Sequence, residues 1–392
     1  MINNLLIFGG GLLQISIISL AKETGFNTIV IDVDPNAPGR EIANQFYVVA
    51  ADDFERTHDI AKKYNVKGIV TSASDKPILM MCKIAKELKL PFPSFKSCNT
   101  LLDKYKFKEF LRSNNLPHAK GILVKGNNLP NQIDISCPLI VKPVMNSGSR
   151  GVIKVENLEE LPKAIAETLK HSKDERFLIE EYVEGDEISI EALVQHGIVH
   201  IVQITDKIVS EAPYNVELGH IQPSKYFYLK EKIKDILQII VDKTGLNNCA
   251  LYSEFKIKED NLTIIEIGPR LGGDFITSDL VKLSTSVNIE KLLIDIATGQ
   301  EIEILSENSA SIVSFFSFTN GLILKNELEI DELKANFPNI MNVQFDLKKG
   351  EKIPIISNSL DRYGSVTLKG FSYKQLIVDV QRIESYLTNK LF

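Results

Sequence analysis

The amino-acid sequence predicts a protein that begins with a doubly wound α/β domain and continues as an α+β structure. Over residues 1–97, short apolar runs alternate with helical periodicity, which is the βαβ pattern of a parallel sheet. From about residue 98, short strands and helices follow one another without that alternation. The 392 residues suffice for two or three domains at roughly 150 residues each. We therefore expect more than one domain.

The first domain, residues 1–97, has a glycine turn between its first strand and its first helix. We expect strands at residues 5–8, 27–31, 46–49 and 68–71, and helices at residues 12–23 and 53–64. Gly9-Gly10-Gly11, with Asp32 about 20 residues on, is similar to a dinucleotide-binding turn but lacks its third glycine. A tight turn leading into a helix is therefore favoured, and an anion at the helix N-terminus is left open. The domain is predicted to be Rossmann-like.

The rest of the chain predicts a small lid, a larger sheet and a C-terminal part. We expect a helix at residues 100–114, ended before Pro117, and a lid at about residues 118–182. The lid has strands at residues 138–142, 151–155 and 177–182 and a helix at residues 159–171. Beyond it we expect strands at residues 187–194, 250–257 and 262–267 and helices at residues 229–244 and 373–390. The expected domain boundaries are 98–300 and 301–392.

Composition excludes several classes of function. The net charge of −6 comes from 51 acidic and 45 basic residues that are interspersed, so a nucleic-acid partner is not expected. Four cysteines lie far apart without a CxxC pair, which disfavours a zinc cage or a disulfide framework. No apolar run approaches the roughly 20 residues of a membrane helix, and the start does not read as a signal peptide. We expect a cytoplasmic protein with small-molecule partners and no membrane contact.

Two acidic residues are predicted to face each other across a hairpin. If Lys258 pairs with Leu262 around a loop of residues 259–261, Glu254 lies directly opposite Glu266. Like charges so placed are destabilising, and a cation would remove the penalty. Carboxylate oxygens suit Mg²⁺. The alternative, that one glutamate faces solvent, stays open.

Two glycine-containing segments suggest anion contacts. In residues 268–275, GPRLGGDF, Arg270 offers a planar fork for a carboxylate or phosphate, and Gly272 and Gly273 allow close backbone approach. After Lys142, residues 146–151 form a loop of small donors that can surround phosphates. A surface arginine and an ordinary turn are the alternatives. ATP brings about four negative charges, for which Lys104, Lys142 and Arg270 are the candidate cations.

Taken in order, these segments resemble the ATP-grasp superfamily. The chain is similar to biotin carboxylase and carbamoyl phosphate synthetase, and around EIGPRLGGDFI most of all to the L-amino-acid ligases. The resemblance spans about residues 1–300 and continues more weakly to DRYGSV at 361–366. It implies an ATP-grasp fold, with a small lid and a large antiparallel-sheet domain that the C-terminal subdomain completes.

The resemblance implies two nucleotide lysines and a loop over the phosphates. Lys104, in LLDKYKFKEFL, matches the first lysine, and Lys142 matches the second, which also makes Lys142 a catalytic candidate. The loop that folds over the β- and γ-phosphates matches Asn146, Ser147, Gly148, Ser149, Arg150 and Gly151.

In LIEEYVEGDEIS the resemblance implies the base and ribose contacts. Glu180 lies at the adenine end, and the backbone of Glu181 and Val183 forms the hinge against the adenine edge. Glu187 matches the carboxylate that binds the ribose.

The resemblance also implies the metal ligands and one catalytic residue. Glu254 and Glu266 match the ligands of one or two Mg²⁺, for which Mn²⁺ is a possible substitute. Arg270 matches the arginine that steadies an acyl phosphate. The third metal position, usually Asn, is Gly268 here, which puts the second Mg²⁺ in doubt.

Five residues are substrate candidates in addition to Arg270. Lys207 and His220 fall near the family's substrate-recognition loop, with a surface lysine and a solvent-facing histidine as the alternatives. Asp75 follows an N-terminal strand, where ligands of parallel sheets gather, or it caps the next helix. Gly272 and Gly273 complete the set.

The implied reaction joins a small-molecule carboxylate to an amine. ATP activates the carboxylate as an acyl phosphate, ADP leaves, and the amine attacks to form an amide, with amino acids among the expected substrates. One rival is an ATP-grasp enzyme that activates bicarbonate or formate. Another is a nucleotide-binding regulatory protein with a degenerate site, supported by Gly268 alone. The resemblance makes a homodimer one of the expected assemblies.

Overall fold

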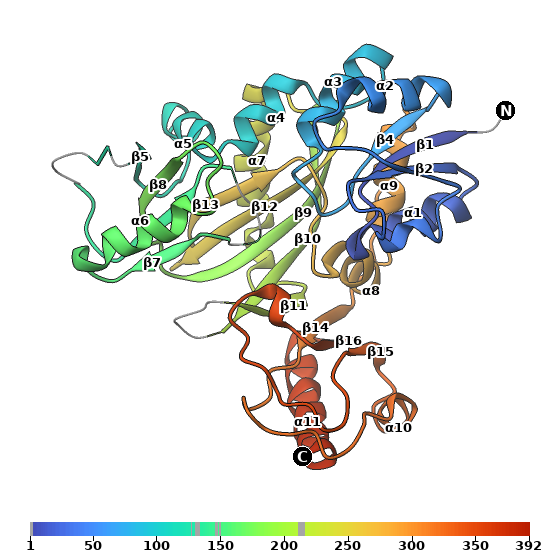
Figure 1. The fold of residues 1–392 in the computed structure, drawn as a ribbon, viewed down its shortest axis with the longest axis vertical. Coiled ribbons are helices and arrows are strands. Elements are labelled where there is room, and N and C mark those ends of the chain that lie inside the picture. Colours follow the sequence, from blue (N-terminus) through green and yellow to red (C-terminus); the bar gives the residue numbers. More distant parts are fainter. Residues whose placement is uncertain (1–2, 127, 130–133, 146–147, 149, 211–215) are drawn as a thin grey trace.

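The computed structural model describes residues 3–126, 128–129, 134–145, 148, 150–210 and 216–392. These residues form three sheets (Figure 1). A parallel sheet lies in the N-terminal domain, a four-stranded antiparallel sheet forms the lid, and an eight-stranded antiparallel sheet lies between them. No helix of the described residues is both long and apolar enough to cross a membrane.

The N-terminal sheet has the strand order β3-β2-β1-β4, with all described pairs parallel. Its strands are β1 (Asn4–Phe8), β2 (Asn27–Asp32), β3 (Gln45–Val48) and β4 (Gly68–Val70), and its helices are α1 (Ile15–Glu23), α2 (Phe54–Lys63) and α3 (Ile78–Leu88). Short 3₁₀ turns lie at Leu12–Gln14 and Pro38–Arg40. The Asp32 carboxylate accepts the N–H of Gly10 at 2.6 Å and that of Asp34 at 2.9 Å. It therefore holds the glycine turn closed, which supports the favoured interpretation of that turn.

One predicted helix is in fact two. The expected single helix at residues 100–114 is wrong, because α4 (Phe95–Leu102) and α5 (Lys104–Ser113) are separated at Asp103. Asp103 has extended backbone, with φ −81° and ψ 105°, and its carboxylate accepts the N–H groups of Tyr105 and Lys106. Aspartate favours such N-caps because its side chain satisfies donors that have no partner inside the helix. The break sets the start of α5 at Lys104.

The lid sheet has the order β5-β8-β6-β7. Its strands are β5 (Gly121–Lys125), β6 (Leu139–Pro143), β7 (Ile153–Val155) and β8 (Arg176–Glu181), and a 3₁₀ turn (Leu158–Glu160) leads into α6 (Leu161–Leu169). Ile165 of α6 packs with Val141 and Ile179 in a small core of buried side chains. This core gives the lid a hydrophobic interior of its own.

The large sheet has the order β13-β12-β9-β10-β11-β14-β16-β15. Its strands are β9 (Asp186–Gln195), β10 (Ile198–Val209), β11 (Glu217–Gln222), β12 (Cys249–Lys258), β13 (Asn261–Gly268), β14 (Ala310–Phe315), β15 (Ile340–Phe345) and β16 (Gly364–Gly370). Helix α7 (Lys230–Thr244), preceded by a 3₁₀ turn (Phe227–Leu229), packs on β10, and α9 (Ile289–Ala297) contacts α1, β4 and β12. Helix α9 thus joins the N-terminal domain to the large sheet.

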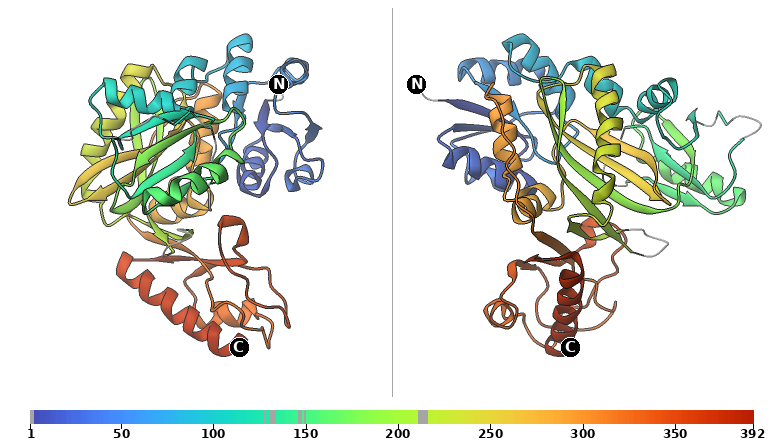
Figure 2. Two further views of the ribbon diagram at one scale, coloured as in Figure 1. Left: turned by 60° about the vertical axis from the view of Figure 1, so that its left-hand side comes forward. Right: turned by 180° about the vertical axis from the view of Figure 1, so that it is seen from behind.

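The C-terminal residues form a lobe at one end of the molecule (Figures 1 and 2). A π-helix (Ile276–Leu280) and α8 (Val281–Thr285) precede α9, while α10 (Ile330–Asn336), a 3₁₀ turn (Ser359–Asp361) and α11 (Tyr373–Leu391) belong to the lobe. Helix α11 packs on β14 and β16. Because β14 pairs with β11, the lobe continues the large sheet.

The hairpin of β12 and β13 differs from the predicted one at its turn. The expected three-residue loop is wrong: Lys258 pairs with Asn261, and the turn consists of Glu259 and Asp260, whose φ angles are 51° and 60°. A β-bulge at Ile265 then shifts the register by one residue. Beyond the bulge, Glu254 lies directly opposite Glu266, as predicted.

Candidate functional site

A cavity of about 640 Å³ opens between the lid, helices α4 and α5, strand β13 and the loop after β4. Five of the predicted site residues line it, namely Asp75, Lys104, Lys142, Glu180 and Glu266. Arg150, at the end of the predicted phosphate loop, lines it as well. Asn146, Ser147 and Ser149 of that loop lie outside the described residues, whereas Gly148 and Gly151 have positive φ angles of 66° and 76°. The cavity thus gathers cations and carboxylates from three parts of the chain.

Glu254 and Glu266 come from neighbouring strands and have different partners. Lys104, at the first position of α5, lies 2.8 Å from Glu266, and Lys207 on β10 lies 2.7 Å from Glu254. Burial works against ionisation of Glu266, but the nearby Lys104 prevails and lowers its pKa to about 2. Burial raises the pKa of Glu254, and the carboxylates of Glu266 and other neighbours raise it further. Glu254 therefore ionises less readily than a free glutamate, although Lys207 favours its charged form.

Lys207 lies at the centre of an acidic cluster. Its ammonium is 2.9 Å from Glu187, 3.0 Å from Glu217 and 2.7 Å from Glu254, and only 1% of its side chain is exposed. The surface-lysine alternative is therefore wrong. Burial disfavours the charge on Glu187, but Lys207 and Lys256 lower its pKa to about 2. The three surrounding carboxylates are enough to explain why Lys207 is buried, without any bound ligand.

The donor set fits a divalent cation. Glu187, Glu217 and Glu254 each place one carboxylate oxygen within 4.8 Å of the others, and Glu266 faces Glu254 across the hairpin. Oxygen ligands of this kind suit Mg²⁺ or Ca²⁺. Even with Lys207 and with Lys256, which lies 3.3 Å from Glu187, three ionised carboxylates would leave a net negative charge, which a cation would offset. The residues present therefore provide the oxygen ligands that such a metal ion needs.

Glu180 has two lysines as partners. Lys142 on β6 lies 2.8 Å from one carboxylate oxygen, and Lys108 on α5 lies 3.1 Å from the other. Burial disfavours the charged carboxylate, but these lysines lower the pKa of Glu180. Lys108 was not among the predicted site residues. Its position four residues after Lys104, on the same face of one helix, is the signal that could have found it.

The other residues of the predicted adenine hinge lie beyond Glu180. The Glu181 carboxylate accepts the N–H of Lys120 at 2.8 Å, which ties β8 to the segment before β5. Val183 lines a second, smaller cavity together with Lys256 and Thr263. Of these two residues, Glu181 thus helps to fix the end of β8, whereas Val183 faces a cavity other than the one that Glu180 lines.

Arg270 is held by a carboxylate of the N-terminal domain. Its guanidinium lies 3.0 Å from Asp75, 3.9 Å from Glu266 and 4.3 Å from the centre of the Tyr252 ring. The alternative that Asp75 caps the next helix is wrong, because the N-cap of α3 is Pro77 and has no side-chain bond. A Cβ at Gly268 would lie 2.9 Å from an Asp75 oxygen, so the glycine leaves room for this carboxylate.

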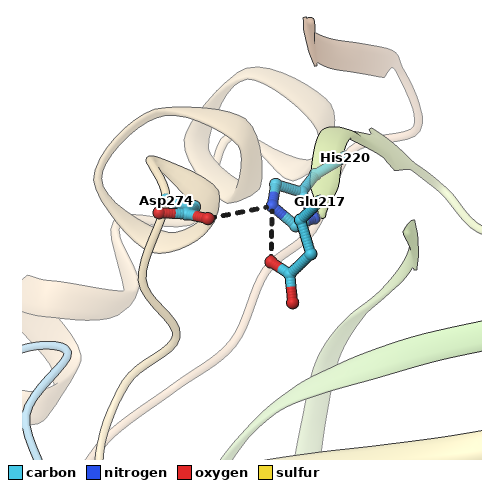
Figure 3. A group of neighbouring side chains, drawn as sticks. All are labelled: Glu217, His220 and Asp274. Carbon is cyan, nitrogen blue, oxygen red and sulfur yellow. Dashed lines mark ion pairs between the residues drawn. The ribbon is translucent and has the colours of Figure 1, made fainter. Parts of the chain in front are cut away.

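His220 lies on β11 and is fully buried, so the alternative of a solvent-facing loop histidine is wrong. Its Nε2 lies 3.4 Å from Glu217 and 3.6 Å from Asp274 (Figure 3). Arg362 donates to both oxygens of Asp274, at 2.8 Å and 2.9 Å. Glu217, Asp274 and Arg362 were missed, and no local pattern links Arg362 to a residue 88 positions earlier. Together they form a polar cluster beside Lys207.

Gly272 makes room for a buried carboxylate beneath the Arg270 loop. Glu191 on β9 is 1% exposed and accepts the N–H of Gly272 at 3.2 Å. A Cβ at position 272 would lie 2.8 Å from both Glu191 oxygens, while Gly273 has more space, with Leu13 and Ala73 as its neighbours. Burial raises the pKa of Glu191 to about 7, although Arg270 and the Gly272 N–H favour its charged form.

Glu191→Gln should make the protein more stable at pH 8 than the parent, and leave it equally stable near pH 4.5. As the pH rises from 4.5 to 7, the unfolded chain releases the Glu191 proton while the folded chain keeps it, so the free energy of unfolding falls by about 3 kcal/mol. Glutamine has no such proton and still accepts the Gly272 N–H. Denaturant unfolding at several pH values measures the difference. The exposed Glu231→Gln is the control, and a difference that does not change with pH would contradict the account.

Two families match parts of the chain. Residues 5–90 match the PylC-like N-terminal domain, and residues 135–279 match the ATP-grasp domain. Among curated proteins, the carbamoyl phosphate synthase large chain of Caldanaerobacter subterraneus subsp. tengcongensis is 24% identical over 294 residues, which are 72% of this chain and 27% of the relative. The carbamoyl phosphate synthase large chain of Clostridium acetobutylicum is 22% identical over 347 residues, which are 83% of this chain and 32% of the relative. The chain thus spans about a quarter to a third of the length of these relatives.

Solved structures resemble the whole chain. The L-amino acid ligase from Bacillus licheniformis has a TM-score of 0.82 at 21% identity, covering 99% of this chain and 98% of that one. Phosphoribosylglycinamide synthetase from Anaerococcus prevotii has a TM-score of 0.75 at 22% identity, covering 100% and 99%. The biotin carboxylase domain dimer of Hydrogenobacter thermophilus 2-oxoglutarate carboxylase, solved with MgADP, ADP and bicarbonate, has a TM-score of 0.72 at 20% identity, covering 97% and 89%. The likeness concerns the fold, and it agrees with the predicted fold class.

Proposed function

This chain contains an ATP-grasp domain preceded by a PylC-like N-terminal domain, and from this premise we propose that it is an ATP-dependent, ADP-forming carboxylate–amine ligase. The observation that supports this proposal most is that Glu254 and Glu266 lie opposite each other on one hairpin. Lys104 forms an ion pair with Glu266 at the wall of the cavity. The domain boundaries at residues 97 and 300, a homodimer and a cytoplasmic location are parts of the same proposal.

In this proposal the cavity binds the nucleotide. Lys104 and Lys142 hold the phosphates of the nucleotide, and Glu180 lies beside its adenine ring. Partly buried lysines are effective here because charge interactions weaken less in a site that excludes water. Glu187 lies apart from the cavity walls, beside Lys207, so its assignment to the ribose rests on the sequence resemblance alone.

Glu254 and Glu266 would hold Mg²⁺, with Glu187 and Glu217 close enough to add oxygen ligands. When bound, the metal supplies positive charge that offsets the charge on the transferred phosphoryl group. The chain's own contribution is to hold both carboxylates on one side of the hairpin and to favour the ionised form of Glu266. Lys104 does the latter by lowering the pKa of Glu266, whereas burial and neighbouring carboxylates raise that of Glu254.

The proposed reaction transfers the γ-phosphoryl group of ATP to a substrate carboxylate, and an amine then displaces phosphate to form an amide. Arg270 would stabilise the charge on the acyl phosphate and on the tetrahedral species. Asp75, which contacts Arg270 from the N-terminal domain, is the candidate group for the amine. His220, Lys207, Gly272 and Gly273 lie in or beside the polar cluster next to this centre and remain substrate candidates.

The test is a substrate screen. The purified chain is incubated with ATP, Mg²⁺ and pools of amino acids and small carboxylic acids, and ADP, phosphate and the condensed product are measured. We expect phosphate release that requires both a carboxylate and an amine. A requirement for bicarbonate or formate would instead favour the rival enzyme, and ATP binding without turnover in any pool would favour a regulatory protein. Light scattering tests the homodimer.

A further inference from the structure

We propose that Lys108 is a positioning residue for the nucleotide: it acts as the second counter-ion of Glu180 and so lets Lys142 leave Glu180 for a phosphate. This inference rests on the proposed nucleotide site. Both lysines line the cavity, and both side chains are only 10% exposed. The two ammonium groups bind different oxygens of the carboxylate, so either can leave without breaking the other contact.

The chain around Glu180 is shaped to admit this second lysine. Glu180 on β8 pairs with Gly121 on β5, and a Cβ at position 121 would lie 2.8 Å from Glu180 Cγ and 3.3 Å from Lys108 Cε. Glycine at this position therefore leaves the space in which the Lys108 side chain reaches the carboxylate. Lys108 also donates a hydrogen bond to the carbonyl of Ala119, which fixes its ammonium there.

Charge then decides what the cluster can do. One carboxylate and two ammonium groups carry a net positive charge in a place where Glu180 is only 5% exposed. If Lys142 turns to a phosphate, Lys108 still neutralises Glu180. Without Lys108, the same movement would leave a buried carboxylate with no nearby counter-charge, which is strongly unfavourable. Burial and the neighbouring Lys142 lower the pKa of Lys108, as expected for a cation held beside another cation.

The test is ATP binding with Mg²⁺, measured by calorimetry, together with KM for ATP and kcat. Lys108→Met should weaken ATP binding by about 10- to 100-fold and raise KM for ATP far more than it lowers kcat. Lys108→Arg keeps the charge and should bind ATP as the parent does. Lys106→Met, on the same helix with a side chain 47% exposed, is the matched control and should also resemble the parent.

A double variant separates charge from packing. In Lys108→Met with Glu180→Gln, the neutral amide needs no counter-ion, so ATP should bind more tightly than to Lys108→Met alone. If the two substitutions only damaged the packing, their effects would add, and the double variant would bind ATP more weakly than Lys108→Met. The inference fails if Lys108→Met binds ATP as the parent does, if Lys108→Arg binds as weakly as Lys108→Met, or if the double variant shows no recovery. If the parent itself binds no ATP, the proposed function fails together with this inference.

Discussion

Replacing Glu266 by glutamine is expected to lower Mg²⁺-dependent ADP formation by about 100-fold or more. Glutamine keeps the size of the side chain but has no charge to hold a cation opposite Glu254 or to pair with Lys104, which lies 2.8 Å away. Burial alone would lower the pKa of Lys104, and Glu266 raises it, so the change also weakens the cation that we propose to bind a phosphate. Initial rates across a Mg²⁺ titration measure the effect.

The control lies on the same hairpin. Glu259 is exposed at its turn, and Glu259→Gln should turn over as fast as the parent. Thermal melts of both variants show whether each one folds. If Glu266→Gln forms ADP at the parent rate at low Mg²⁺, Glu266 is not a metal ligand and the proposed site is misplaced.

The hairpin illustrates what the sequence could predict. The register set by pairing Lys258 with Leu262 predicted that Glu254 faces Glu266, although the turn it assumed is one residue too long. A Glu-Asp pair lacks the glycine or asparagine that usually marks a two-residue turn with positive φ, so the true turn left no clear signal. The bulge at Ile265 compensated for the difference. The pairing of Glu254 with Glu266 was therefore predicted correctly from a wrong turn, because the bulge, which the sequence did not reveal, restored the expected register.

Contacts between distant strands could not be predicted in this way. Lys207 is buried because Glu187, Glu217 and Glu254 reach it from β9, β11 and β12, and nothing near Lys207 in the sequence shows this. A lone lysine is more often at the surface. His220 was placed in a loop because strand β11 is short: it pairs with β10 just before it and with β14, which lies about 90 residues later.

The Asp103 break shows the opposite case, in which a local signal was present but not used. Apolar periodicity continues from α4 into α5, so one helix was predicted. An aspartate just before a new helical turn is a strong N-cap signal. The cap places Lys104 at the first turn of α5, from where its ammonium reaches Glu266. Capping thus determines the position of a predicted site residue, which periodicity alone leaves undefined.

Arg270→Ala is expected to lower kcat by about 100- to 1,000-fold while KM for ATP changes little. In the described residues Arg270 touches Asp75, Glu266 and the Tyr252 ring, whereas Lys104 and Lys142 line the cavity in which ATP would bind. Charge that develops on the acyl group should therefore lose its partner, while the nucleotide keeps its own. Arg270→Lys keeps the charge but not the planar fork, so it should recover only part of the rate.

Steady-state kinetics with saturating carboxylate and amine measures the split between kcat and KM, and Arg382→Ala, exposed on α11, is the control. A large rise in KM for ATP at unchanged kcat would instead make Arg270 a nucleotide ligand. The variant also removes the cation that opposes the burial of Glu191, so the pKa of Glu191 should rise further. The pH-dependent loss of stability would then extend to higher pH than in the parent. Denaturant unfolding of Arg270→Ala therefore tests the same contact network without any substrate.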